Sequence, residues 1–238
     1  MRSWEDPRSI IQQNVVSTLN VLEAVRRHTP TTRVLIACSG QEYGPPRALP
    51  ITEDHPLRPQ NPYAASKASA DLLAGFDSDA HDLDVLRMRA FNHAGPGQTN
   101  RYLVSRVAHR IVEAETSSEN GRVEIAAGHP DVRRDFTDVR DVVRAYRMAL
   151  DVADPGAYNV CSNRAVTSAE ILAGLATHSP LEVEQLADSS RERDHEIFEV
   201  RGSYDRLSAA TGWQPEIALE QTLRDTLDWW RAELAVLA

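Results

Sequence analysis

The stretch Val34-Leu35-Ile36-Ala37-Cys38, with Ser39 directly after it, decides the fold class of this 238-residue chain. Five apolar residues in a row, without the alternation of a half-exposed strand, are typical of a strand buried on both faces of a parallel sheet. Open α/β sheets bind their ligands at the carboxyl ends of the strands. Ser39 is therefore a candidate site residue.

Helical and apolar segments alternate on both sides of this run. Strands are expected at 85–88, 123–126 and 158–161, and helices at 10–27, 63–75, 102–115 and 139–150. This order predicts an α/β protein with a doubly wound parallel sheet. After Val166 the segments shorten, which predicts a main domain over 1–165 and a small α/β lobe over 166–238, interleaved with segments near 92–135.

The composition of the chain excludes several classes of protein. The hydrophobic share of 42% and charged share of 26% are typical of a globular protein. A formal net charge of −9 argues against nucleic-acid partners. No apolar run could span a membrane, and no signal peptide is recognisable. Cys38 and Cys161 fit packed thiols in a reducing compartment and lack metal-ligand spacing, as do His109, His129 and His178. We expect a cytoplasmic protein without a metal site.

Lys67 is the only lysine in a chain whose other cations are arginines. It follows Tyr63 by four residues, so both side chains share one helix face. A nearby ammonium favours the phenolate form of tyrosine and so eases proton exchange with a substrate oxygen, which the Ser39 hydroxyl could orient. Ser39, Tyr63 and Lys67 thus suit hydride transfer to a carbonyl or from a carbinol.

Several ordered motifs support this interpretation. They are Asn14-Val15-Val16-Ser17-Thr18, Ser39-Gly40-Gln41-Glu42-Tyr43-Gly44, Tyr63-x-x-x-Lys67, Arg89-Ala90-Phe91-Asn92-His93 and Arg134-Asp135-Phe136-Thr137-Asp138. Together they resemble the extended short-chain dehydrogenase/reductase family, the NAD-dependent epimerases and dehydratases of nucleotide sugars. The strings around 91–98, 134–141 and 158–162 look most like the group of GDP-4-keto-6-deoxy-mannose reductases and GDP-mannose 4,6-dehydratases.

The resemblance implies a partial NAD(P)-binding Rossmann-like domain and a substrate-binding C-terminal lobe. Catalysis would fall to Ser39, Tyr63 and Lys67, and a cofactor, NADP or NAD, would contact Tyr63, Lys67, Asn92 and His93. A nucleotide sugar, with a GDP-linked deoxyhexose favoured, would contact Ser39, Gln41, Asn92, Arg134 and Arg193. Arg191 is an alternative to Arg193. The family's helices, here near 10–27 and 63–75, would form a homodimer.

The residues after Ser39 distinguish reactions within the family. Dehydratases of this kind carry an acid and a glutamate where this chain has Gly40 and Gln41, which cannot transfer a proton. A shift of one residue would bring Glu42 into question. We expect reduction of a C4 keto group, with epimerisation or 4,6-dehydration as alternatives.

The first glycine of the chain is Gly40, and no G-x-G-x-x-G sequence occurs. In the family such a turn seats the cofactor pyrophosphate after the first strand. We therefore expect an incomplete, N-terminally truncated Rossmann-like sheet, lacking its first strands and roughly 70 residues at ordinary element lengths, with weakened cofactor binding. The alternative of a different class is a non-catalytic module that binds sugar nucleotides or dimerises.

Overall fold

The computed structural model describes residues 2–117, 121–126, 131–186 and 197–237. Within these ranges the chain forms two compact units, each with its own sheet and apolar core. The first unit comprises Met1–Phe91, Val142–Asn163 and Gly202–Gln214. The second comprises Asn92–Asp141, Arg164–Arg201 and Pro215–Ala238.

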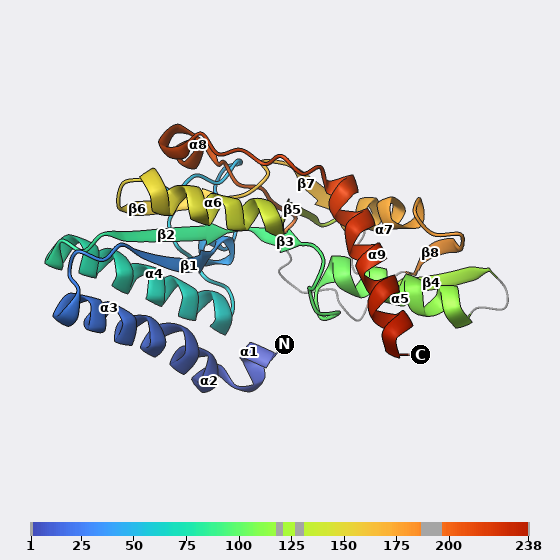
Figure 1. The fold of residues 1–238 in the computed structure, drawn as a ribbon, viewed down its shortest axis with the longest axis horizontal. Helices are drawn as coiled ribbons and strands as arrows, with labels where there is room; N and C mark the ends of the chain where they lie inside the picture. The colour runs from blue at the N-terminus through green and yellow to red at the C-terminus, as the bar shows by residue number, and fades with distance from the viewer. Residues whose placement is uncertain (1, 118–120, 127–130, 187–196, 238) are drawn as a thin grey trace. The chain divides into compact units, whose positions relative to one another are not determined.

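The first unit is built on a parallel sheet with the strand order β1-β2-β6 (Figure 1). Its strands are β1 (Val34–Ser39), β2 (Val85–Ala90) and β6 (Gly156–Val160). Val34 pairs with Val85 and Ser39 pairs with Ala90, so the carboxyl ends of β1 and β2 lie side by side. The α/β class with a parallel sheet, predicted from the apolar runs, is confirmed.

Helices cover both faces of this sheet: α3 (Ser17–His28) and α4 (Pro62–His81) one face, α6 (Val139–Val152) the other (Figure 1). Val85 packs in a cluster with Leu22 of α3, whereas the next strand residue, Leu86, packs with Ala145 of α6. Neighbouring strand residues point to opposite faces, which is why an unbroken apolar run is needed here. Trp213, after α8 (Asp205–Thr211), is fully buried in the cluster on the α6 side.

The helix predicted over 10–27 differs in detail from the observed one. The run comprises α1 (Arg2–Glu5), α2 (Pro7–Ile11), a π-helical turn η1 (Gln12–Val16) and α3. The N–H of Ser17 donates to the carbonyl of Gln12, five residues earlier, and Thr18 Oγ1 donates to the carbonyl of Asn14 at 2.7 Å. Apolar spacing continues through this turn, so the sequence pattern did not reveal it.

The second unit contains a sheet of β3 (Asn92–Ala94), β5 (Arg133–Asp138), β7 (Ala165–Thr167) and β9 (Glu199–Val200). A separate parallel pair joins β4 (Arg122–Ala126) and β8 (Glu182–Leu186). Its apolar core lies among α5 (Leu103–Ser117), α7 (Ser168–Ala176) and α9 (Leu219–Leu237). None of the helices in the described ranges has the length and hydropathy of a membrane span.

Candidate active site

Ser39 ends β1, and the 3-10 turn η2 (Gly40–Tyr43) begins directly after it. Ser39 Oγ accepts the backbone N–H of Gln41 at 3.2 Å, and Glu42 Oε1 accepts the backbone N–H of Ser39 at 2.6 Å. These reciprocal bonds form a capping box, which fixes the chain where strand changes to turn. Ser39 is thereby held at the carboxyl end of β1.

Two glycines allow this turn to pack closely. A Cβ on Gly40 would lie 2.9 Å from the ring of Phe91. Gly44 has φ +63, and a Cβ there would overlap the carbonyl oxygen of Arg58. A side chain at either Gly40 or Gly44 would therefore clash with its neighbours. At Gly44 the positive φ also favours glycine.

Tyr63 and Lys67 lie in the first two turns of α4. The helix begins with Pro62 after Asn61, whose Oδ1 accepts the N–H of Ala64 at 2.8 Å. Lys67 Nζ donates to the backbone carbonyl of Ala37 at 2.8 Å, two residues before Ser39. The Lys67 ammonium and Ser39 therefore lie at the same end of β1. Lys67 also shares its face of α4 with Tyr63, four residues earlier.

Asn14 connects the π-helical turn to this helix. Its Nδ2 donates to Ser66 Oγ at 2.9 Å, and Ser66 Oγ in turn donates to the carbonyl of Tyr63 at 2.8 Å. Single π turns inside helices are frequent at functional sites. The sequence motif had singled out Asn14 without giving it a role; the structure shows that it holds the start of α4 through Ser66.

The remaining predicted residues are divided between the two units. Gln41 is in η2 with Ser39, in the first unit, whereas Asn92 and His93 lie on β3 and Arg134 on β5, in the second unit. Asn92 pairs with Phe136 of β5, and Arg134 Nη1 donates to the carbonyls of Arg133 and Ile197 at 2.9 and 2.8 Å. Arg193 and its alternative Arg191 lie outside the described residues.

A buried cluster of charged side chains lies beneath the Ser39 turn, and the sequence did not predict it. Asp71 of α4 accepts from Arg89 Nε at 2.8 Å and Nη2 at 2.9 Å, and from Arg87 Nη1 at 3.0 Å. Arg89 Nη1 also donates to Tyr43 Oη at 3.0 Å. Glu42 and Asp71 are 0% exposed and Arg89 only 5%, so these three side chains have almost no contact with water, whereas Arg87 is 22% exposed.

Burial and neighbouring charges set the protonation of these groups. Loss of hydration, together with the charge of Asp71, raises the pKa of Glu42 to about 8. Burial opposes ionisation of Asp71 too, but the bonds from Arg89 outweigh it and hold the pKa of Asp71 below its usual value. Burial also raises the pKa of the Cys38 thiol well above its usual value.

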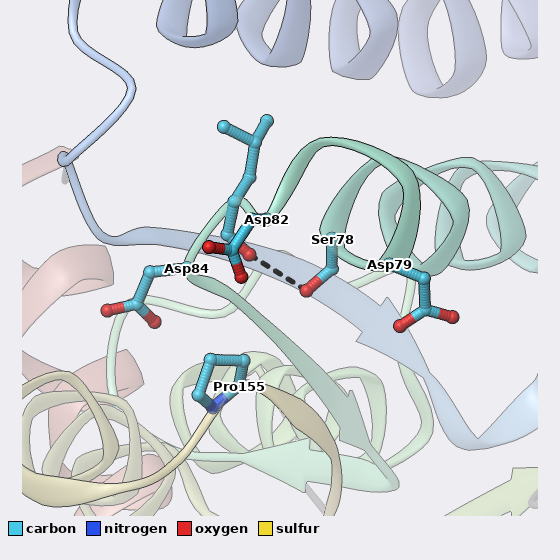
Figure 2. A pocket seen from close by; sticks show the side chains of 6 residues that line it. Ser78, Asp79, Asp82, Asp84 and Pro155 are labelled. Atoms are coloured by element: carbon cyan, nitrogen blue, oxygen red, sulfur yellow. Dashed lines mark hydrogen bonds between the residues drawn. The ribbon is translucent and has the colours of Figure 1, made fainter.

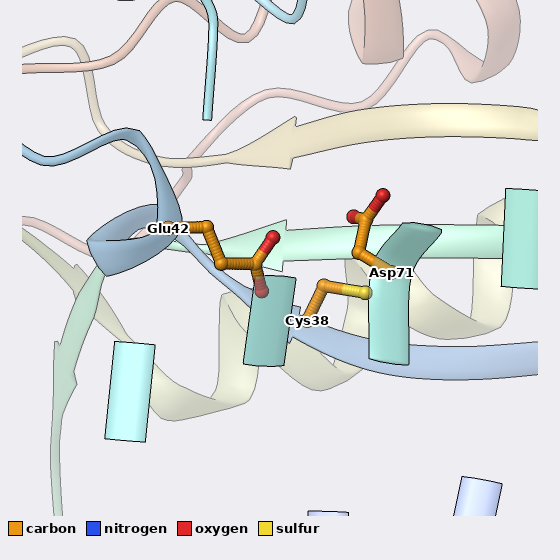
Figure 3. Close-up of side chains that lie close together, drawn as sticks. All are labelled: Cys38, Glu42 and Asp71. Carbon is orange, nitrogen blue, oxygen red and sulfur yellow. The ribbon is translucent and has the colours of Figure 1, made fainter. Parts of the chain in front are cut away.

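Cys38, Glu42 and Asp71 gather between β1, η2 and α4 (Figure 3), with one potential ligand atom from each within 4.8 Å of the others. Arg89 already donates to both oxygens of Asp71, and its Nε lies 3.9 Å from Glu42 Oε2. A metal cation would face this guanidinium at close range. The geometry therefore favours a charge cluster over a metal centre.

A pocket lies at the other end of the sheet, around the turn between α4 and β2 (Figure 2). It is lined by Ser78, Asp79, Asp82, Leu83, Asp84 and Pro155, and Ser78 Oγ donates to the carbonyl of Leu83 at 2.8 Å. Asp84 precedes the first residue of β2, whereas Ser39 pairs with the last. This acidic pocket is thus separate from the Ser39 turn.

Comparison with known proteins gives consistent matches. The family model for GDP-mannose 4,6 dehydratase matches residues 1–226. GDP-6-deoxy-D-mannose reductase of Pseudomonas aeruginosa is 37% identical over 235 residues, covering 98% of this chain and 77% of that protein. UDP-glucose 4-epimerase of Mycolicibacterium smegmatis is 30% identical over 237 residues, covering 97% of this chain and 72% of that protein. The solved structure of RMD from P. aeruginosa complexed with NADPH superposes with a TM-score of 0.90 at 36% identity, covering 98% of this chain and 77% of that one.

Proposed function

Because this chain belongs to the GDP-mannose 4,6-dehydratase family, we propose that it reduces the C4 keto group of a GDP-linked 4-keto-6-deoxyhexose with a nicotinamide cofactor. The similarity to a GDP-6-deoxy-D-mannose reductase over 98% of the chain carries the proposal. The related structure complexed with NADPH supports the cofactor class. Similarity to a UDP-glucose 4-epimerase keeps epimerisation as the alternative.

The turn after Ser39 favours reduction over dehydration. Expelling a sugar hydroxyl needs an acid beside the substrate, and neither Gly40 nor Gln41 carries a proton that it can transfer. Glu42, the nearest carboxyl in sequence, is 0% exposed and bonds the Ser39 N–H from inside the turn. Such a buried side chain is unsuited to reach a substrate at the surface of the sheet edge.

In the proposed reaction the bound cofactor supplies a hydride to C4, and Tyr63 donates a proton to the C4 oxygen, giving an alcohol. Ser39 Oγ would hold that oxygen, and the Lys67 ammonium would favour the tyrosinate left after transfer. An ammonium has three donors, and the bond to the Ala37 carbonyl uses one. Lys67 therefore has two donors left, which fit the ribose hydroxyls of a bound dinucleotide.

Substrate and cofactor contacts are carried over from the resemblance. We propose that Gln41 and Asn92 contact the sugar, that His93 contacts the cofactor, and that Arg134 binds the diphosphate. Arg134 is oriented by its bonds to the carbonyls of Arg133 and Ile197. A planar guanidinium held in this way suits bidentate binding of phosphate oxygens. Arg193 or Arg191 would supply the second cation.

We also propose a homodimer through the exposed faces of α4 and the helices before β1. Leu72 and Phe76 lie one turn apart on α4 and are 62% and 60% exposed. Ile11 is 50% exposed and Leu19 is 39% exposed. Large apolar side chains exposed on neighbouring helices are typical of interaction surfaces. Light scattering should show a dimer that a Leu72→Glu/Phe76→Glu variant converts to monomer; a wild-type monomer at micromolar concentration would exclude the dimer.

The first test of the function is cofactor binding. Titration with NADPH and with NADH, followed by fluorescence, should show saturable binding, which we expect to be weak because no Gly-rich turn occurs in the 238 residues. No binding of either at millimolar concentration would refute an independent oxidoreductase and leave the non-catalytic module. Binding of one cofactor but not the other would decide between NADP and NAD.

The second test is product formation from GDP-4-keto-6-deoxy-mannose. Tyr63→Phe should lower kcat by about 10²-fold or more, the usual contribution of a positioned proton donor. Tyr102→Phe is the matched control, since Tyr102 is 60% exposed in the second unit. Equal turnover of the two variants would remove Tyr63 as the proton donor. Interconversion of 4-epimers without net cofactor consumption would favour epimerisation.

A further inference from the structure

The two carboxyl oxygens of Glu42 have different surroundings. Oε1 accepts the backbone N–H of Ser39 at 2.6 Å. Oε2 is buried and has no hydrogen-bond partner among the described residues. A buried oxygen without a partner normally costs stability, and an ionised carboxylate with one donor bond costs more. This buried oxygen without a partner therefore requires an explanation.

Titratable and charged groups face Glu42 from each element packed against it: Cys38 of β1, Asp71 of α4 and Arg89 of β2. Arg87 of β2 bonds Asp71, and Tyr43 of the turn itself bonds Arg89. Tyr43 Oη already donates to Asn159 Oδ1 at 2.7 Å, and the Cys38 thiol is neutral because burial raises its pKa.

The donors of this cluster are directed at Asp71. Arg89 donates to both of its oxygens, Arg87 adds a third bond, and the Arg89 Nε lies 3.9 Å from Glu42 Oε2, beyond hydrogen-bond distance. A second ionised carboxylate beside Asp71 would meet a like charge with no donor turned toward it. A protonated Glu42 avoids this, because its O–H can donate to Asp71 while Oε1 keeps the Ser39 bond.

We propose that Glu42 is a positioning residue that acts in its neutral form: one oxygen holds the Ser39 backbone and the other donates its proton to Asp71. Loss of that proton to solvent places two buried negative charges side by side and opens the turn that carries Ser39. The effect on catalysis rests on the proposed function, in which Ser39 orients the substrate carbonyl. The structural part, a neutral Glu42 linked to Ser39, does not depend on any activity.

The sign of the pH effect follows from the raised pKa. The ordinary carboxyl pKa is 4.5, and the pKa of Glu42 in the folded protein is about 8. Between these two pH values the folded protein holds a proton that the unfolded chain has released. Stability from this group is fully present below 4.5 and is lost as the pH rises through about 8. The Ser39 turn of the folded protein should loosen where Glu42 itself loses its proton, near pH 8.

The test uses wild type and Glu42→Gln, which is neutral at all these pH values and can still accept from Ser39 and donate to Asp71. In ¹³C-carboxyl-labelled protein, the Glu42 signal should titrate near pH 8, and the ¹⁵N-labelled Ser39 amide signal should move with the same midpoint. In Glu42→Gln the Ser39 amide should not move. A Glu42 titration near pH 4 to 5, or an unchanged Ser39 titration in the variant, would overturn the proposal.

Glu53→Gln is the matched control for loss of a buried carboxyl. Glu53 Oε1 accepts the backbone N–H of Asn159 at 2.7 Å, so this variant also disturbs the interior, but it should leave the Ser39 titration intact. If reductase activity is found, the alkaline fall in kcat should share the Glu42 midpoint and vanish in Glu42→Gln. Absence of activity would count against the proposed function, whereas the two titrations decide the role of Glu42.

Discussion

Replacing Asp71 by asparagine should destabilise the first unit strongly, because it removes the charge that the buried Arg89 requires. The Asp71 side chain is 0% exposed and accepts three bonds from Arg89 and Arg87. Asparagine keeps the shape but presents an amide to the guanidinium, which stays charged at any accessible pH. The variant thus tests the charge and leaves the volume unchanged.

Breaking a buried ion pair by removing one partner costs about 3 to 5 kcal/mol. We expect the lower end, about 3 kcal/mol, since Glu42 lies 3.9 Å from Arg89 and can ionise to replace part of the lost charge. Asp84→Asn is the control, because Asp84 makes one bond of 2.7 Å to Arg33 and both side chains are about 30% exposed. Solvent-accessible ion pairs such as Arg33–Asp84 contribute about 0 to 1 kcal/mol to the free energy of unfolding.

Native-state hydrogen exchange of the β1 and β2 amides measures how much stability each of the two variants loses in the first unit. A loss of about 3 kcal/mol corresponds to roughly 10²-fold faster exchange of the most protected amides, and a loss under about 1 kcal/mol to less than about fivefold. Equal acceleration by Asp71→Asn and Asp84→Asn would refute the reasoning that burial makes the Asp71 charge essential.

Three further substitutions test local features. Gly44→Ala should lower the melting temperature by several degrees, since φ is +63 and the Cβ would overlap the Arg58 carbonyl, whereas Gly212→Ala, at φ +74 with open space around it, should lower it less. Asn61→Ala should cost about 1 kcal/mol in urea unfolding through loss of the α4 cap, and no change would contradict the 2.8 Å bond. Trp213→Ala should cost about 3 to 5 kcal/mol, measured by chemical denaturation, because this side chain is fully buried; a loss under about 1 kcal/mol would show that the site collapses.

The sheet of the first unit was predictable because helices cover both of its faces, so that most consecutive strand residues are apolar. Val34 and Cys38 are buried, Leu35 and Ile36 are half-buried and Ala37 is exposed, yet the unbroken apolar run still indicated a parallel strand. Ser39 was located from the same pattern, as the first polar residue after the run. Tyr63 and Lys67 were located by their spacing on α4. Their roles stay predictions.

The cluster beneath Ser39 was not predictable from pattern, because charged residues are normally assigned to the surface. Arg89 and Asp71 are 18 positions apart, and only the packing of α4 on β2 brings them together. Two signals existed in the sequence. Arg87 and Arg89 interrupt an otherwise apolar strand, and Asp71 stands among the alanines that form the buried face of α4.

The bond from Lys67 to the Ala37 carbonyl has a practical consequence. Lys67 carries the only side-chain amine in the sequence, so reductive methylation with ¹³C-formaldehyde labels Lys67, beside the strand end, and otherwise only the N-terminal α-amine, without mutagenesis. The methylated amine keeps its positive charge and can still donate to Ala37. The Lys67 resonance, identified by its loss in a Lys67→Arg variant, would then report whether a dinucleotide, a sugar nucleotide or neither approaches this edge of the sheet.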